Sequence, residues 1–189
     1  MKKICSFFLL ILIGYAAFSQ KYVPVIEQGT LITYKVASRA TGQTANITLT
    51  MLNLTDTIKI KWEIPFVGTG SFQITPKGVQ SGTKLLIQEP QPDEITKLND
   101  DETLMFLSKD TFSSLVNNKT FTLNGYIFNV KTDTSTFSIS NQAADVFYAV
   151  SVKGNREIWI LNNPGLPIIC RSNRAARGID FELQSVTNN

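Results

Sequence analysis

The 189 residues of the chain include no histidine, and this absence removes much of the usual catalytic repertoire. Without an imidazole there is no Ser-His-Asp triad, no Cys-His pair and no histidine-ligated zinc site. A glycine-rich loop between a strand and a helix is also missing, so nothing in the sequence predicts a phosphate-binding cradle. Among the common catalytic groups, carboxylates remain.

Carboxylates gather in two short stretches, Asp93-Glu94 and Asp100-Asp101-Glu102. Such residues could bind calcium or supply the two acids of a glycosidase. A glycosidase holds its carboxylates at a fixed separation inside a cleft, whereas neighbouring acids in a polar stretch are typical of a solvated loop. We therefore expect a protein that is not an enzyme and that carries no metal ion and no cofactor.

Long hydrophobic runs are scarce: one occurs, at residues 4–17, and it is too short for a comfortable membrane span. Lys2 and Lys3 precede it, and Ala17 and Ser19 place small residues at the positions that a signal peptidase reads. We expect residues 1–19 to be a signal peptide and residues 20–189 to form one exported domain. Its location would be the periplasm, the cell envelope or the extracellular medium, with no integral membrane segment after cleavage. An uncleaved N-terminal anchor is the alternative.

Neither sign of charge is in large excess. Without Lys2 and Lys3, the 18 basic residues become 16 against 15 acidic residues, so the net charge falls from +3 to +1. Three arginines cluster at positions 171, 174 and 177, which is more typical of a solvated turn than of a docking patch. We therefore expect no nucleic-acid partner.

Cysteine is also scarce, because the chain contains only Cys5 and Cys170. Cys5 lies in the expected signal peptide, so the mature chain cannot form an internal disulfide. A single remaining thiol could pair between chains or react. The neighbouring Ile168 and Ile169 favour another interpretation, since apolar surroundings raise the pKa of a thiol and make it inert. We expect Cys170 to be buried and unreactive.

Apolar and polar residues alternate with a period of two through much of the sequence. In residues 57–64, Ile58, Ile60 and Trp62 alternate with threonine, lysine and glutamate. This period is typical of a strand whose successive side chains point to opposite faces, so Trp62 should face the interior. The same alternation occurs at 44–51, 136–140, 146–152 and 179–184. One dry and one wet face indicate antiparallel pairing.

Turn signals separate these segments at short intervals. Asn124-Gly125 lies between two apolar stretches and predicts a type I′ hairpin, which needs positive φ at both central residues. The spacing of the turns fits roughly a dozen strands. We predict a mainly β fold, an antiparallel curved sheet or half-barrel, with a β-sandwich as the alternative.

One short helix is expected to begin after Ser108. The Ser108 hydroxyl can cap the first turn, and Asp110 complements the positive end of a helix. Leu107 and Phe112 are spaced as a hydrophobic staple. The apolar stripe ends at Asn117-Asn118, where the helix should end.

The stretch REIWILNNPGLPIICR, residues 156–171, has no polar face in its strand-like part. Ile158 and Ile160 fall on one face, and Trp159 and Leu161 fall on the other. We expect one face to pack in the core and the other to be covered by the helix after Ser108 or by a ligand. Because an indole can stack on a ligand at the mouth of an apolar cavity, Trp159 and Leu161 are the candidate ligand-binding residues.

The domain resembles the periplasmic lipoprotein-carrier superfamily and related exported proteins. The resemblance rests on the N-terminal signal, the amphipathic strands, the short helix after TLMFLS and the late element IWILNNPGLPI. It implies an open, curved sheet around an apolar cavity, with helical segments across its mouth. It identifies no functional residue.

Two functions fit these observations. The first is an exported, non-enzymatic binding module that holds an apolar small molecule or lipid on the concave face of the sheet. The second is a structural or protein-interaction domain of the cell envelope. A cavity larger than the side chains can fill favours the first.

Overall fold

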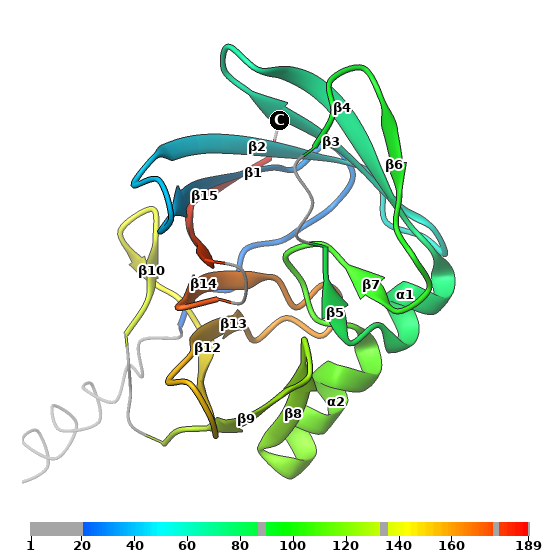
Figure 1. Cartoon of the computed structure of the whole chain (residues 1–189). Helices are drawn as coiled ribbons and strands as arrows, with labels where there is room; N and C mark the ends of the chain where they lie inside the picture. Colours follow the sequence, from blue (N-terminus) through cyan, green and yellow to red (C-terminus); the bar gives the residue numbers. More distant parts are fainter. Residues whose placement is uncertain (1–20, 87–89, 133–135, 176–177, 189) are drawn as a thin grey trace, which may run out of the picture.

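A computed structural model describes residues 21–86, 90–132, 136–175 and 178–188. The expected signal peptide, residues 1–19, lies outside the described residues. Within them the protein is mainly β (Figure 1). The strands are β1 (Leu31–Ser38), β2 (Thr44–Asn53), β3 (Ile58–Ile64), β4 (Gly68–Ile74), β5 (Lys84–Leu85), β6 (Ile95–Lys97), β7 (Glu102–Thr103), β8 (Thr120–Leu123), β9 (Tyr126–Val130), β10 (Ser138–Ile139), β11 (Gln142–Ala143), β12 (Val146–Ser151), β13 (Glu157–Leu161), β14 (Ile169–Asn173) and β15 (Ile179–Thr187). The helices are α1 (Pro76–Ser81) and α2 (Lys109–Asn118).

Eleven of the strands form one large sheet in the order β6-β4-β3-β2-β1-β15-β14-β13-β12-β9-β8. Neighbouring strands run antiparallel except β6, which pairs parallel with β4. The sheet is strongly bent and does not close on itself (Figure 1). The expectation of a mainly β fold built on an open, curved sheet is therefore confirmed. The parallel edge strand makes the sheet mixed, which the alternation of residues did not indicate.

The position of β15 links the two parts of the sheet. It pairs with β1 on one side and with β14 on the other. The first four strands therefore join the later strands through this one strand, which lies near the middle of the sheet.

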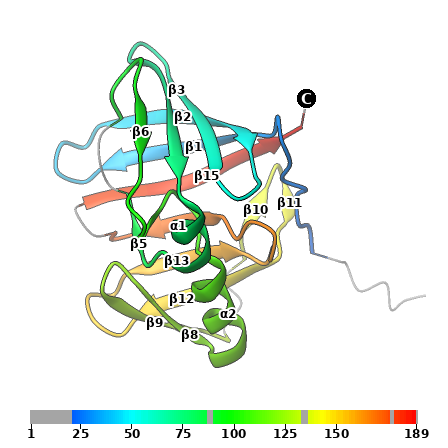
Figure 2. The same cartoon turned by 90° about the vertical axis from the view of Figure 1, so that its right-hand side faces the viewer.

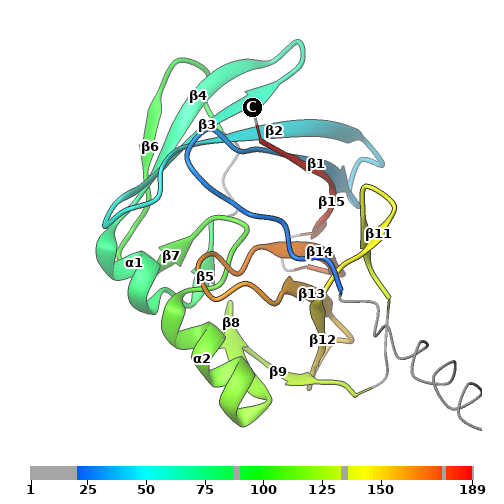
Figure 3. The same cartoon turned by 180° about the vertical axis from the view of Figure 1, so that it is seen from behind.

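Two-stranded ribbons and a long N-terminal segment complete the β structure. The β5–β7 pair lies inside the bend of the large sheet (Figure 1). Residues 21–30, dark blue in Figure 3, run from beside β11 to the start of β1. Tyr22 fastens this segment, since its amide donates to the Ala143 carbonyl and its carbonyl accepts from Asp145.

The alternation in β3 places side chains as expected. Ile58, Ile60 and Trp62 are buried, and the lysines and the glutamate between them are exposed. The prediction that Trp62 faces the interior is confirmed, because its side chain is fully buried.

The Asn124-Gly125 turn joins β8 to β9 as predicted. Asn124 has φ of 51° and Gly125 has φ of 76°, the two positive values that a type I′ turn requires. The strands on either side pair from Leu123 and Tyr126 outward.

Helix α2 begins where the sequence predicted. The Ser108 hydroxyl accepts from the amide of Thr111 at 3.3 Å, which satisfies one of the free N–H groups of the first turn. Phe112 and Leu115 are buried, and the helix ends at Asn118 before Lys119 adopts a left-handed conformation.

Helix α1 was not predicted, because it is only six residues long and contains a glycine. Its start nevertheless carries recognisable signals: Thr75 caps the amide of Gly78, and Pro76 occupies the first turn. The two helices lie next to each other beside the sheet (Figure 2), where Gln80 of α1 donates to Asp110 of α2 at 2.7 Å. No helix in the described part of the chain is long and apolar enough to cross a membrane.

Candidate functional site

A row of paired residues forms the floor of a cavity on the concave face of the sheet. Ile158 pairs with Ser172, Ser172 with Phe181, Phe181 with Val36, and Val36 with Ala45. These residues come from β13, β14, β15, β1 and β2 in turn. All five line one cavity of about 430 Å³, which is within the usual range of small-molecule sites.

The walls of the cavity are apolar. They come from β2, β3, β4, β8 and β9 of the sheet and from the β5–β7 ribbon with the residues that follow each of its strands. The apolar wall residues include Ile47, Leu49, Ile64, Phe72, Leu85, Leu86, Leu104, Met105, Leu123 and Phe128. The cavity is thus a space between two layers of the fold, the large sheet and the ribbon inside its bend.

Hydrogen bonds of the backbone and of the Asn124 side chain hold this inner ribbon in place. The Asn124 side chain accepts from the Leu85 amide at 2.8 Å, and the Asn124 amide donates to the Thr83 carbonyl. On the other side, the Met105 carbonyl accepts from the Ile169 amide at 2.8 Å. The ribbon is therefore fixed at two points, to the β8–β9 hairpin and to β14. These bonds hold the ribbon at a set distance from the floor of the cavity.

Polar groups gather where the strands of the floor begin or end. Ser38, Thr41, Gln43 and Arg156 line this part of the cavity, and Thr41 and Gln43 are exposed. A second hollow of about 480 Å³ adjoins it and shares most of its lining, including Val36 and Ser38. The mouth of the cavity is therefore at this edge of the sheet.

Arg156 is the one charged residue in the lining that the described residues provide. Its guanidinium carbon lies 3.7 Å from the centre of the Tyr126 ring, a cation–π contact. Its Nη1 donates to the Lys153 carbonyl at 3.3 Å. Its Nε is buried and has no hydrogen-bond partner among the described residues.

The predicted ligand-binding residues, Trp159 and Leu161, do not line this cavity. Both are buried, at 4% and 0% exposure, and Trp159 lies on the face of β13 opposite to Ile158. The isoleucine face, which the sequence could not distinguish from the tryptophan face, is the one that borders the cavity.

Aromatic and cationic side chains cover Trp159. The centre of the Trp159 ring lies 4.7 Å from the centre of the Tyr148 ring. The guanidinium carbon of Arg171 lies 5.1 Å from the centre of the Trp159 ring and 5.2 Å from that of Phe137. Helix α2 contacts the opposite face, because its Phe112 packs on Phe147, the partner of Ile160. Helix α2 therefore lies against the isoleucine face of β13 and not against Trp159.

A polar network continues along the Trp159 face. The Tyr148 hydroxyl donates to Glu157 at 2.8 Å, and Arg171 pairs with Glu182 at 2.9 Å. Loss of hydration and then the Glu157 carboxylate raise the pKa of Tyr148 to about 12. The Tyr148–Glu157 hydrogen bond and the Arg171–Glu182 ion pair link neighbouring strands, so this network stabilises the fold.

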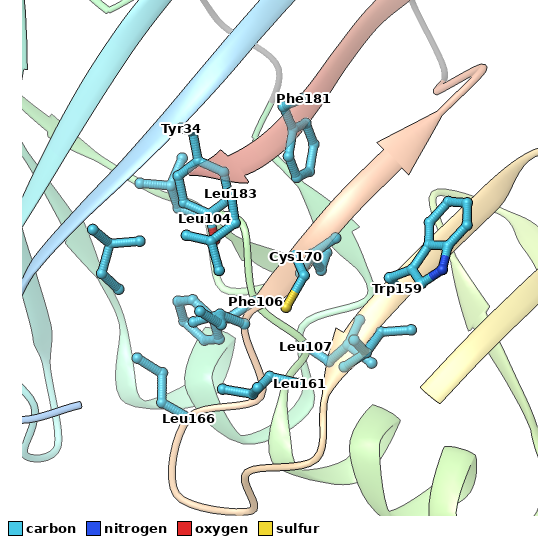
Figure 4. Close-up of a cluster of buried hydrophobic side chains, with 14 of the residues drawn as sticks. Tyr34, Leu104, Phe106, Leu107, Trp159, Leu161, Leu166, Cys170, Phe181 and Leu183 are labelled. Carbon is cyan, nitrogen blue, oxygen red and sulfur yellow. The ribbon is translucent and has the colours of Figure 1, made fainter. Parts of the chain in front are cut away.

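Cys170 lies in the core as predicted. It is the extra residue of a bulge, since Trp159 pairs with Arg171 while Ile160 pairs with Ile169. Its side chain is fully buried near Tyr34 and Phe106 (Figure 4). Burial raises the pKa of the Cys170 thiol to about 12, and it raises the pKa of the Tyr34 phenol well above its usual value.

The arrangement suits the retention of an apolar molecule. In the described part of the chain, no group of three or more histidine, cysteine, aspartate or glutamate side chains is placed to hold a metal ion. Asp100 and Asp101 pair with Lys77 and Lys84 outside the cavity lining. The cavity instead combines an apolar interior with a polar mouth. The sequence matches no family model, and no curated protein is significantly similar to it.

Proposed function

We propose that the protein is an exported, non-enzymatic binding module that holds an apolar or lipid-like ligand in the cavity on the concave face of its sheet. The observation that carries this proposal is the cavity of about 430 Å³, with its apolar walls and polar mouth. A side-chain core would normally fill such a space, because protein interiors pack to nearly crystalline density. An apolar space of this size is the usual setting of a ligand.

The energetics of an alkyl chain fit the site. Each methylene group moved from water into the cavity contributes about 0.8 kcal/mol. Eight such groups give about 6 kcal/mol before the loss of translational and rotational freedom is subtracted. The ligand-contacting residues in this proposal are Ile158, Phe181 and Val36, in place of Trp159 and Leu161.

The resemblance to the periplasmic lipoprotein-carrier superfamily is a second support. It implies an open, curved sheet around an apolar cavity, and the proposed binding site occupies that place in the fold. Export, with loss of residues 1–19, would bring the protein into contact with envelope lipids.

The proposal is tested by native mass spectrometry of protein purified from its own cell envelope. We expect a bound apolar molecule that is released on denaturation and identified by lipid analysis. Val36→Phe should prevent retention, because Val36 lines the floor of the cavity between Ala45 and Phe181.

Lys35→Phe is the matched control. Lys35 is the neighbouring residue on the same strand, exposed and absent from the cavity lining, so this variant should retain the ligand. If the wild-type protein carries no apolar molecule and takes none up from envelope lipid extract, the proposed function is wrong. Equal retention by the two variants would place the ligand elsewhere.

A further inference from the structure

Arg156 occupies an unusual position for an arginine. It precedes β13 by one residue and has the same parity as Ile158, so its side chain lies on the concave side and lines the cavity. Beyond it the lining is mostly apolar. A cation is therefore held at the boundary between an apolar space and the polar mouth.

The turn before Arg156 leaves room for the guanidinium. Gly154 has φ of 86°, and a Cβ on it would collide with Nη1 of Arg156. The Tyr126 ring also packs against the guanidinium, with 3.7 Å between the ring centre and the guanidinium carbon. The group is thus held in one orientation before any ligand arrives, which reduces the entropy lost on binding.

Two of the other arginines beside the large sheet form ion pairs with carboxylates of the protein itself. Arg39 lies 3.3 Å from Asp180, and Arg171 lies 2.9 Å from Glu182. Arg156 has no carboxylate within ion-pair distance in the described part of the chain, and its buried Nε lacks an acceptor. A buried N–H without an acceptor is costly, so an acceptor supplied by a ligand would relieve this cost.

From this geometry we infer that Arg156 receives the anionic head group of a single-chain amphiphile whose alkyl chain fills the cavity. The inference rests on the proposed function and specifies the class of ligand. A planar guanidinium matches two oxygens of a carboxylate or of a phosphate monoester, and both head groups share this chemistry. Among the described residues, no acidic side chain lines the mouth.

The test is isothermal titration calorimetry of the purified protein after bound lipid has been removed. Dodecanoate, dodecyl phosphate and dodecanol share one chain and differ in the head group. We expect the wild-type protein to bind at least one of the anions about tenfold more tightly than the alcohol, as a charge-assisted hydrogen bond would provide. The ratio between the two anions identifies the head group as carboxylate or phosphate.

Two variants separate the charge of Arg156 from its shape. Arg156→Gln should raise the Kd of the preferred anion about tenfold and leave that of dodecanol within about twofold. The Kd of this anion for Arg156→Lys should lie between those of the wild-type protein and Arg156→Gln. Lysine keeps the positive charge but lacks the planar set of N–H donors. Lys153→Gln is the matched control: Lys153 is exposed, carries the same charge and does not line the cavity, so binding should be unchanged.

A salt titration of the wild-type protein tests the same point without any variant. Affinity for the anion should fall between low and high ionic strength, while affinity for dodecanol should not. Equal affinity for anion and alcohol overturns the inference and leaves the proposed function standing. The inference is also overturned if folded Arg156→Gln loses affinity for the anion and for dodecanol equally. Arg156 would then contribute only to the wall of the cavity. If the wild-type protein binds none of the three compounds, the proposed function fails and the inference fails with it.

Discussion

Removal of the Trp62 indole is the most direct test of how the sheet packs. Trp62 lies in the middle of β3, pairs with Leu49 and Gly70, and is fully buried. A Cβ on Gly70 would lie 2.7 Å from the indole nitrogen, so the glycine makes the space that the ring occupies. Trp62→Ala would leave this space empty.

The cost follows from the buried area. An aromatic side chain of this kind removes about 150–250 Å² from water, which corresponds to about 4–6 kcal/mol at about 25 cal/mol per Å². This is an upper value, because the unfolded chain already buries part of its surface and alanine keeps the Cβ. We expect Trp62→Ala to lower the free energy of unfolding by about 3–5 kcal/mol.

Urea unfolding followed by circular dichroism measures this loss, provided that the denaturant slope stays unchanged. Trp62→Phe should cost less than half as much, since the Trp62 Nε1 is buried without a hydrogen-bond partner among the described residues. Lys61→Ala, on the exposed face of the same strand, is the control and should stay within about 0.5 kcal/mol. A loss below about 1 kcal/mol for Trp62→Ala would show that the inward face of β3 has been misassigned.

Two further predictions concern the core and α2. Native Cys170 should react with a thiol reagent about a thousandfold more slowly than the denatured chain, because burial raises its pKa to about 12 and leaves little thiolate; rapid labelling of the folded protein would contradict this. Ser108→Ala should cost about 1 kcal/mol through loss of the cap on the Thr111 amide. Ser113→Ala, exposed on the same helix, should have almost no effect, and equal effects would show that the cap contributes nothing.

The sequence predicted those elements whose signals are local. The alternation in β3 identified a half-buried strand, Asn124-Gly125 identified a hairpin, and Ser108 marked the start of a helix. Each of these signals depends on residues only a few positions apart. The parallel strand β6 has no such signal, because its three residues acquire their meaning only by pairing with β4.

The candidate site was harder to predict for a related reason. The alternation in β13 places Ile158 and Trp159 on opposite faces of the strand. Both faces are apolar and buried, so there is no contrast between a dry and a wet face to show which one borders the cavity. The assignment depends on the register with Ser172 and, through it, with Phe181. Register between distant strands cannot be read from one sequence without the structure. Arg156 was visible at the start of the same stretch, and its parity with Ile158 was the available signal.

The central place of β15 has a consequence for the order of events during synthesis. The chain is made from its N-terminus, so the side of β1 that pairs with Ile179–Thr187 remains open until those residues have emerged. Pairing across so long a stretch of chain must first overcome the entropy of loop closure, which makes it slow. Phe181 then inserts between Val36 and Ser172 and completes the floor of the cavity. The floor of the cavity is therefore completed late, when β15 pairs with both β1 and β14.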